Sequence, residues 1–227
     1  MNKTNRKKAA LLFAVLLFPS ILYVVFSSGK HTFLYRPILG PKTVNVDGDT
    51  LYHSVSLFSF TNCAQNKVSM KDLKGKIIVL GFYNNSDSLS SARIYTQMMT
   101  LHEKFETTKD FVLVSISVNN DPISVSGACR VESQFPIQKG RWLLGVLDDD
   151  VYEFATQQLF LESEESKTES SPSFNYKKLV LLDKFRRIRS YSDALQYAET
   201  KILGDDIKVV IAEDFIPKKN KTKKKEI

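Results

Sequence analysis

Two largely apolar runs constrain the fold of this chain more than any other feature of its sequence. "IIVLGFY" fills residues 77–83, and "FVLVSISV" fills residues 111–118. Continuous apolar runs of this length are typical of strands that are buried on both faces of a sheet. Between them, apolar residues recur at helical intervals from about Ser88 to Phe105, which predicts an amphipathic helix. The sequence therefore predicts an α/β core.

Further elements are predicted on both sides of this core. Apolar and polar residues alternate over residues 56–62 and 67–70, which predicts a hairpin at one edge of the sheet. The predicted elements follow the order of a thioredoxin-like fold, with an added N-terminal β-hairpin. That order is strand, helix, strand, helix, an antiparallel strand pair and a final helix. The later elements are predicted as a helix over 121–135, a loop over 140–148, a helix from about Asp149 to Leu159, an exposed loop over 162–173, a strand pair within 178–192 and a helix within 194–215.

A polar turn, "NNSDSLSS" at residues 84–91, joins the first buried strand to its helix. This is a place where α/β proteins often carry their chemistry. Asp87 or Ser88 is predicted to cap the helix. The turn holds no cysteine, no histidine and no glycine-rich phosphate loop, so it has the position of a site without a reactive group.

Residues 9–26 form an uncharged run of 18 residues, which predicts a transmembrane helix. Lysine and arginine precede this run, so the positive-inside rule places the N-terminus in the cytoplasm and the following domain on the exported, periplasmic side of the inner (cytoplasmic) membrane. A cleaved signal peptide is the alternative, but the run is longer than a typical signal h-region. The predicted parts are a cytoplasmic basic tail over 1–8, a single-pass anchor over 9–27, a linker over 28–50, the domain over 51–216 and a disordered basic tail over 217–227.

The net charge of +7 is concentrated at the two ends of the chain. Residues 3–8 contribute +4 and residues 218–226 contribute +5, which leaves −2 for everything between them. A slightly acidic body argues against nucleic acid as a partner. The basic C-terminal tail is expected to be solvated, because contact with anionic lipid is most favourable at the cytoplasmic leaflet, which this tail should not face.

The chain contains two cysteines, Cys63 and Cys129. Their separation does not resemble any redox or metal-binding motif. A disulfide is possible in an oxidising compartment, but the sequence favours two unpaired thiols.

Several stretches together resemble the Sco/SenC family of membrane-anchored, thioredoxin-like proteins. The resemblance extends from about Tyr35 to Phe215 and is carried above all by "TLYHSVSLFSFTN" and "LVLLDKFRRIRSYSD", with "VSMKDLKGKIIVLGFY" and "FVLVSISVNNDP" between them. It implies a role linked to copper delivery during cytochrome c oxidase assembly. The implied partners are a respiratory oxidase subunit or another assembly factor.

The resemblance also implies where copper ligands would stand. By this resemblance, the family's copper site would consist of two cysteines in the polar turn, with three residues between them, and a histidine shortly before the late strand. These positions match Asp87, Ser91 and Asn175, so none of the three ligands is present. Soft thiolates and imidazole suit Cu(I), whereas a carboxylate, an alcohol and an amide suit hard cations. We therefore expect no cofactor, no metal site and no catalytic residue in this turn.

Other candidate ligands are expected to have structural roles. The histidines are His31, His53 and His102, and surface or packing roles are favoured for the last two. Met98 and Met99 have the spacing of core residues. The acidic clusters at residues 148–150 and 204–206 are expected to be solvated.

Two functions from different classes remain at this stage. The first is a tethered assembly or interaction protein that is not an enzyme and does not bind metal. The second is an active copper chaperone or thiol-disulfide protein that uses Cys63 and Cys129. The first is favoured because Ser91 cannot replace a resolving thiol.

Overall fold

Two compact units divide the chain, residues 1–34 and residues 35–227. In the first unit, helix α1 spans Lys3–Ser28 and contains Pro19. Within the described part of the chain, no helix meets the length and apolar character required to cross a membrane. The computed structural model describes residues 3–28, 35–46, 48–119, 130, 140–164 and 173–215.

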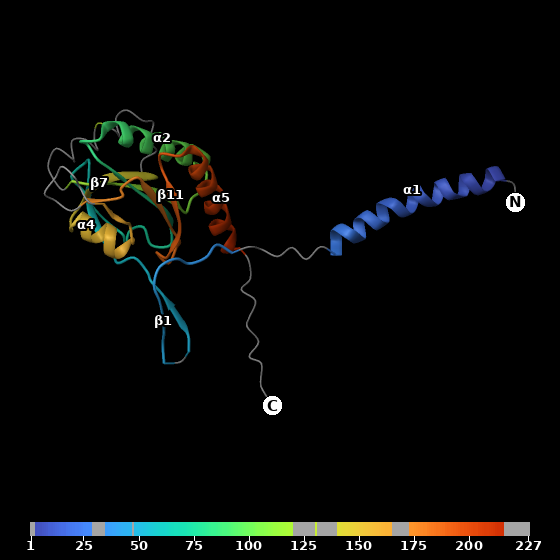
Figure 1. The fold of residues 1–227 in the computed structure, drawn as a ribbon, viewed down its shortest axis with the longest axis horizontal. Coiled ribbons are helices and arrows are strands. Elements are labelled where there is room, and N and C mark those ends of the chain that lie inside the picture. The colour runs from blue at the N-terminus through green and yellow to red at the C-terminus, as the bar shows by residue number, and fades with distance from the viewer. Residues whose placement is uncertain are drawn as a thin grey trace. The chain divides into compact units, whose positions relative to one another are not determined.

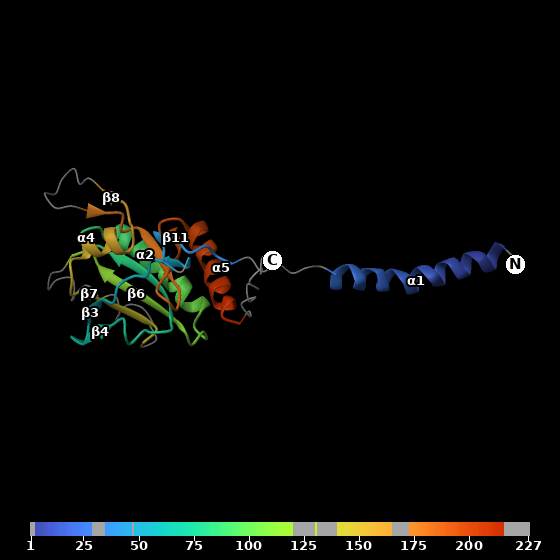
Figure 2. The same ribbon diagram turned by 90° about the horizontal axis from the view of Figure 1, so that it is seen from below.

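A seven-stranded mixed sheet forms the centre of the second unit, with the strand order β11-β10-β5-β6-β7-β3-β4 (Figure 1). Strands β5, β6 and β7 are parallel, and the other neighbouring pairs are antiparallel. Figure 2 shows β3 and β4 beside β6 and β7. The strands are β3 (Ser59–Asn62), β4 (Lys67–Ser69), β5 (Ile77–Tyr83), β6 (Phe111–Ser117), β7 (Trp142–Leu147), β10 (Lys178–Leu182) and β11 (Ile188–Asp193).

Helices cover both faces of this sheet, and the alternation of side chains along β5 separates two cores. Ile78 and Leu80 belong to the core that also contains Phe154 of η1. Ile77 and Val79 belong to the opposite core, which α2 and α5 cover. Burial on both faces explains why β5 is a continuous apolar run. The helices are α2 (Ser88–Lys104), α4 (Val151–Glu153), the π-helix η1 (Phe154–Gln158) and α5 (Tyr197–Glu213).

Most of the predicted elements are confirmed. The hairpin is β3 and β4, the buried strands are β5 and β6, and the late pair is β10 and β11. The amphipathic helix and the final helix are α2 and α5. Within the predicted loop over 162–173, residues 163–164 form β8, which pairs with β9 at residues 173–174. The helix predicted over 121–135 lies outside the described residues, apart from Arg130, which is helical.

The loop predicted over 140–148 is wrong, because residues 142–147 form β7 inside the sheet. Gly145 interrupts the apolar run in the sequence, but the structure requires a glycine there. A Cβ at this position would lie 2.5 Å from the backbone oxygen of Thr61 and 2.6 Å from the ring of Phe60. The glycine therefore allows β3 and β7 to pair closely.

Gly145→Ala is expected to lower the free energy of unfolding by about 1–3 kcal/mol, the usual cost of overpacking a core. The reason is that the clash involves the backbone of β3, which cannot move away as a flexible side chain could. Urea unfolding monitored by circular dichroism would measure the change. Gly75→Ala is a poor control, because Gly75 has a φ of +79° and an alanine there would be strained for a different reason. An exposed strand position, such as Thr43→Ala, is the better control. Equal stability of Gly145→Ala and the wild type would contradict this account.

A two-stranded ribbon stands apart from the large sheet where the sequence predicts a linker over 28–50. It consists of β1 (Lys42–Val44) and β2 (Thr50–Tyr52), and all of their residues are exposed. Figure 1 shows this ribbon projecting from the body of the unit. The second unit also begins at residue 35, earlier than the predicted domain start at residue 51.

A buried charge network fastens the start of the second unit to the sheet. Arg189 on β11 is 4% exposed and pairs with Asp183 at 3.3 Å and with Glu213 of α5 at 2.6 Å. Its guanidinium also donates to the backbone oxygens of Arg36 and Pro37. Leu39 then donates its backbone N–H to Ile188 of β11, so this segment runs along that edge of the sheet.

Candidate functional site

The polar turn of residues 84–91 lies at the carboxyl end of β5, where α2 begins. Asp87 is the N-cap of α2, and its Oδ1 accepts a hydrogen bond from the backbone N–H of Ser90 at 3.1 Å. This confirms the predicted cap. The carboxylate therefore satisfies one of the free N–H groups at the start of the helix.

Ser91 closes the turn onto the end of the strand. Its side chain is buried, and its Oγ donates to the backbone oxygen of Asn84 at 2.7 Å. The same Oγ accepts from the backbone N–H of Asn84 at 2.9 Å. The hydroxyl of Ser91 thus bonds both the backbone N–H and the backbone oxygen of Asn84.

Tyr176 brings the late part of the chain into this turn. Its hydroxyl donates to Oδ2 of Asp87 at 2.5 Å. This hydrogen bond and that of Ser90 lower the pKa of the Asp87 carboxyl. Burial, and then the Asp87 carboxylate, raise the pKa of the Tyr176 hydroxyl. Both oxygens of the carboxylate are therefore engaged within the protein.

Asn175 stands beside this pair. Its backbone N–H donates to the backbone oxygen of Glu162 at 2.8 Å, and its Oδ1 accepts from the backbone N–H of Lys177 at 3.3 Å. The resemblance to the Sco/SenC family predicts the third ligand position at Asn175. The side chain that contacts Asp87 belongs to the next residue, Tyr176. The sequence could have indicated Tyr176 only through its place directly after Asn175, the predicted position of the third ligand.

Copper does not fit this donor set. The groups at positions 87, 91 and 176 are a carboxylate and two hydroxyls, all joined by hydrogen bonds within the protein. Cu(I) prefers thiolate, thioether and imidazole ligands. In the part of the chain that the structure describes, no group of three or more His, Cys, Asp or Glu residues could hold a metal ion.

The histidines and methionines considered from the sequence lie in packed surroundings, except for His31, which is outside the described residues. His53 places its Nε2 2.9 Å from the backbone oxygen of Gln158. His102 is buried 6.1 Å from the ring of Trp142, and burial lowers its pKa. Met98 is fully buried, and Met99 packs against the same core, which confirms the predicted core role.

The prediction of unpaired cysteines is wrong for Cys63, which is disulfide-bonded. Cys129 is the chain's other cysteine and lies outside the described residues. Cys63 follows β3, whose Asn62 is in register with Gly145 of β7. Strand β3 is three strands from β5, roughly 14 Å at the usual strand spacing. A disulfide-bonded sulfur at that position is not a ligand beside Asp87.

The acidic clusters take part in local structure. Asp148 accepts hydrogen bonds from Ser59 at 2.7 Å and Thr61 at 3.2 Å and pairs with Lys67, so it fastens β3 and β4 to the end of β7. These hydrogen bonds, led by that of Lys67, lower the pKa of Asp148. Asp150 caps α4. In the second cluster, Asp206 is buried and pairs with Arg36, while Asp205 pairs with Lys208.

Known structures share the fold of this chain. A SCO1/SenC family lipoprotein from Bacillus anthracis is similar over 71% of this chain and 96% of its own, with a TM-score of 0.61 and 19% identity. BsSco, a member of the Sco family of cytochrome c oxidase assembly proteins, is similar over 70% and 94%, with a TM-score of 0.58 and 16% identity. Copper-bound ScoI from Arabidopsis thaliana is similar over 70% and 98%, with a TM-score of 0.53 and 14% identity.

These likenesses confirm the predicted α/β, thioredoxin-like fold of the Sco/SenC type. At such low identities they concern the fold. No protein-family model matches the chain, and no curated protein matches it.

Asp87→Ala is expected to lower the free energy of unfolding by about 1 kcal/mol at neutral pH, as for other lost N-caps. The pKa of Asp87 is lowered in the folded state, so its contribution is present above its unfolded pKa and is lost as pH falls through the folded pKa. The difference between Asp87→Ala and the wild type should therefore shrink in acid. Denaturant unfolding over a pH series would measure it. A pH-independent difference, or an equal loss in the exposed control Asp49→Ala, would contradict this assignment.

Proposed function

We propose that this chain is a divergent Sco/SenC-type protein that acts by binding a partner during assembly of a respiratory oxidase, without carrying copper in the polar turn. The observation that supports it most is the closed hydrogen-bond set of Asp87, Ser91 and Tyr176 at the place of the family's ligands. The described strands beside that turn form the central sheet of the α/β fold. A scaffold kept without soft ligands favours recognition over metal transfer.

Cu(I) titration of the full chain in detergent, against a chromogenic Cu(I) chelator, tests this proposal. We expect the chelator to retain the copper, with no stoichiometric binding by the protein. Because reducing conditions can open the disulfide of Cys63, the double variant Cys63→Ser/Cys129→Ser serves as a control for binding by released thiols. Submicromolar binding that persists in this double variant would overturn the proposal.

The same proposal holds that the chain does not act as a thiol-disulfide oxidoreductase. Thiol-disulfide exchange at a thioredoxin-like site requires a thiolate at the start of the helix and a second thiol to resolve the mixed disulfide. Asp87 and Ser91 supply neither. The chain is therefore expected not to accelerate reduction of a disulfide substrate beyond the rate of a Cys63→Ser/Cys129→Ser variant, and a clear acceleration would count against the proposal.

We further propose that the N-terminal segment anchors the protein in the inner membrane as a single span, with the domain on the periplasmic side. The support comes from the uncharged run of residues 9–26 and from the basic residues that precede it. Carbonate extraction of membranes and protease protection of spheroplasts would test it. Release of the chain by carbonate, or protection of the domain in spheroplasts, would contradict it.

A further inference from the structure

A pocket lies next to the pair of Asp87 and Tyr176, and its lining includes Leu161 and Tyr191 from the core that also contains Phe154 of η1. Its volume is about 240 Å³, and Asn175 lines it immediately before Tyr176. This volume is below the ~300–1,000 Å³ that is usual for small-molecule and cofactor sites. It suits a single side chain from another molecule. The lining residues are Phe160, Leu161, Glu162, Asn175, Lys178 and Tyr191.

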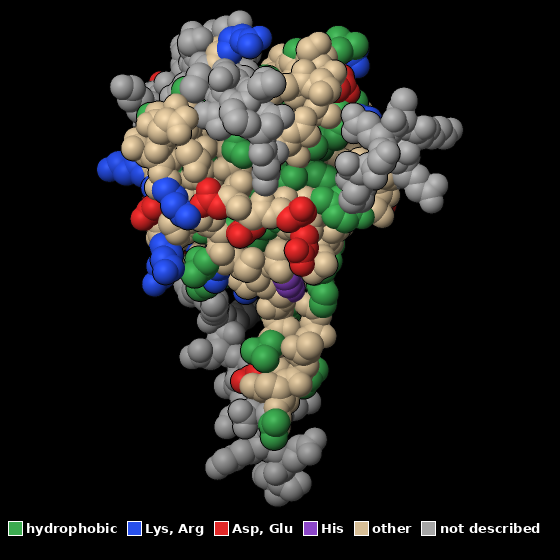
Figure 3. Space-filling view, turned by 90° about the vertical axis from the view of Figure 1, so that its left-hand side faces the viewer, with side chains coloured by type: hydrophobic (Ala, Val, Ile, Leu, Met, Phe, Trp, Pro, Cys, Tyr) green, Lys and Arg blue, Asp and Glu red, His purple; other side chains and the backbone are tan. Residues whose placement is uncertain are grey.

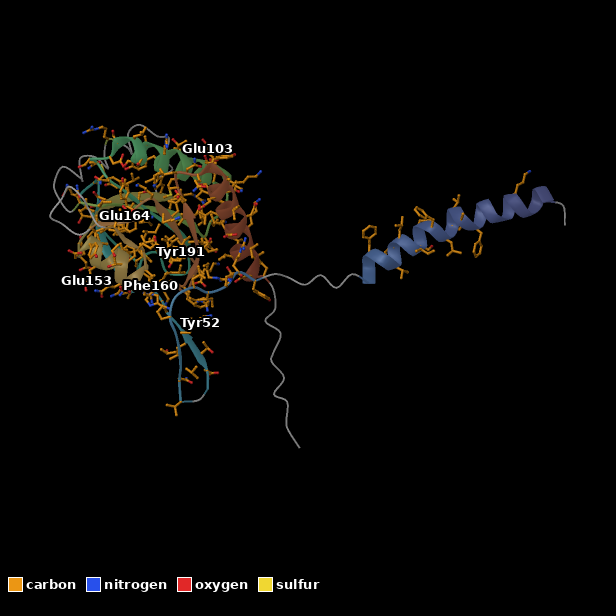
Figure 4. The ribbon with its side chains drawn as sticks, viewed as in Figure 1. Tyr52, Glu103, Glu153, Phe160, Glu164 and Tyr191 are labelled. Atoms are coloured by element: carbon orange, nitrogen blue, oxygen red, sulfur yellow. The ribbon has the colours of Figure 1, made fainter. Side chains whose placement is uncertain are left out.

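Aromatic rings form part of the wall, and the backbone around Phe160 is unusual. Phe160 has a φ of +53°, a conformation that costs a bulky residue energy, and it follows the π-helix η1. The Tyr191 hydroxyl donates to the backbone oxygen of Leu159 at 2.8 Å. The ring of His53 packs against the edge of the Phe160 ring at 4.7 Å. These contacts hold Phe160 at the pocket with 38% of its surface exposed (Figure 4).

The charges at the pocket are unbalanced. Glu162 is exposed and has no ion-pair partner among the described residues. Lys178, the cation of the lining, is already paired with Asp193 at 3.8 Å. Figure 3 shows acidic side chains on the face above the projecting ribbon, with Lys and Arg side chains toward its left edge. The unpaired charge that faces an incoming group is thus a carboxylate.

We propose that this pocket binds one arginine side chain of a partner protein. The guanidinium would pair with the Glu162 carboxylate and lie against the ring of Phe160 or Tyr191. The side-chain oxygen of Asn175 accepts one long hydrogen bond from Lys177 and has a further lone pair for a donor. This inference rests on the proposed interaction function and names the chemistry of the partner.

Arginine fits these features better than other side chains. Its planar, permanently charged group can pair with a carboxylate and stack on an aromatic ring at the same time. A lysine would make the ion pair as a point charge, and a tryptophan would use the rings but leave Glu162 unpaired. Arginine is also among the residues that contribute most to binding at protein interfaces.

The test uses blocked amino acids titrated into the full chain in detergent, with binding followed by the NMR signals of the Phe160 and Tyr191 rings. The probes are the N-acetyl methylamides of arginine, citrulline, lysine and tryptophan. We expect millimolar binding of the arginine probe. The citrulline probe, which has the same shape without the charge, should bind about three- to fivefold more weakly, in line with the strength of exposed ion pairs.

Glu162→Gln should weaken the arginine probe by a similar factor and leave the citrulline probe unchanged. Glu103→Gln is the matched control, because Glu103 is an exposed glutamate on α2 (Figure 4) and should leave both probes unchanged. Phe160→Leu should weaken the arginine probe as well. If that variant fails to fold, Glu162→Gln still decides the matter.

Equal binding of the arginine and citrulline probes, tighter binding of the lysine or tryptophan probe, or an unchanged affinity in Glu162→Gln would each overturn the pocket assignment. These results would leave the copper titration untouched. Conversely, submicromolar Cu(I) binding by a chain that still prefers the arginine probe would overturn the proposed function and keep the pocket. The two failures are therefore distinguishable.

Discussion

Replacing Asp87 and Ser91 by cysteine and Tyr176 by histidine is expected to give the chain a Cu(I) site of submicromolar affinity. Position 87 is the N-cap of α2 and position 91 lies about one helical turn further along, so two thiolates there would lie on the same side of the helix start. Tyr176 already reaches the side chain at position 87. A histidine is shorter than a tyrosine, but metal–ligand distances of ~2.0–2.3 Å on each side of an ion would fill the gap.

Competition against a Cu(I) chelator would measure the affinity of this triple variant. The matched variant replaces Asn175, instead of Tyr176, by histidine and should bind Cu(I) more weakly. The reason is that the Asn175 side chain accepts from Lys177 and lines the neighbouring pocket. A variant with a single new cysteine should also lose most of the affinity. Tighter binding by the Asn175→His form would show that Tyr176 does not mark the third position.

Arg189→Met is expected to lower the free energy of unfolding by about 3–5 kcal/mol, the usual effect of breaking a buried ion pair by removing one partner. Arg189 is almost fully buried, and its loss leaves the Glu213 carboxylate without the cation it pairs with, while Asp183 keeps Arg187 at 2.8 Å. Methionine keeps much of the side-chain volume, so the loss reports mainly on charge. Guanidinium unfolding of the wild type and the variant would measure it.

Lys208→Met is the control for this experiment. Lys208 pairs with Asp205 on the exposed surface of α5, where both side chains are more than half exposed. Ion pairs of that kind contribute little to stability. A similar loss of unfolding free energy in both variants would mean that the buried ion pairs of Arg189 stabilise the fold no more than an exposed ion pair does.

The elements that the sequence predicts correctly are those whose burial follows a simple period. Strand β5 is buried on both faces and is a plain apolar run, while α2 buries one stripe and shows helical spacing. The cap at Asp87 was predictable because a carboxylate before a helix has few competing roles. Such patterns can be predicted because they depend only on residues that are close together in the sequence.

The features that the sequence did not reveal depend on distant residues. Strand β7 resembled a loop because Gly145 breaks its apolar run, and the need for that glycine arises from Thr61 on another strand. The contact of Tyr176 with Asp87 joins residues that are 89 positions apart. The disulfide of Cys63 and the conformation of Phe160 likewise have no local signature in composition.

The two outer strands of the sheet limit how another protein can attach. Strand β4 has three residues and begins with Lys67, and the segment ending at Leu39 runs along β11. Short, charged or covered edges give an incoming polypeptide little main-chain ladder to extend. A molecule that binds at the edges of the seven-stranded sheet must therefore recognise side chains, and its selectivity should depend on a few positions there.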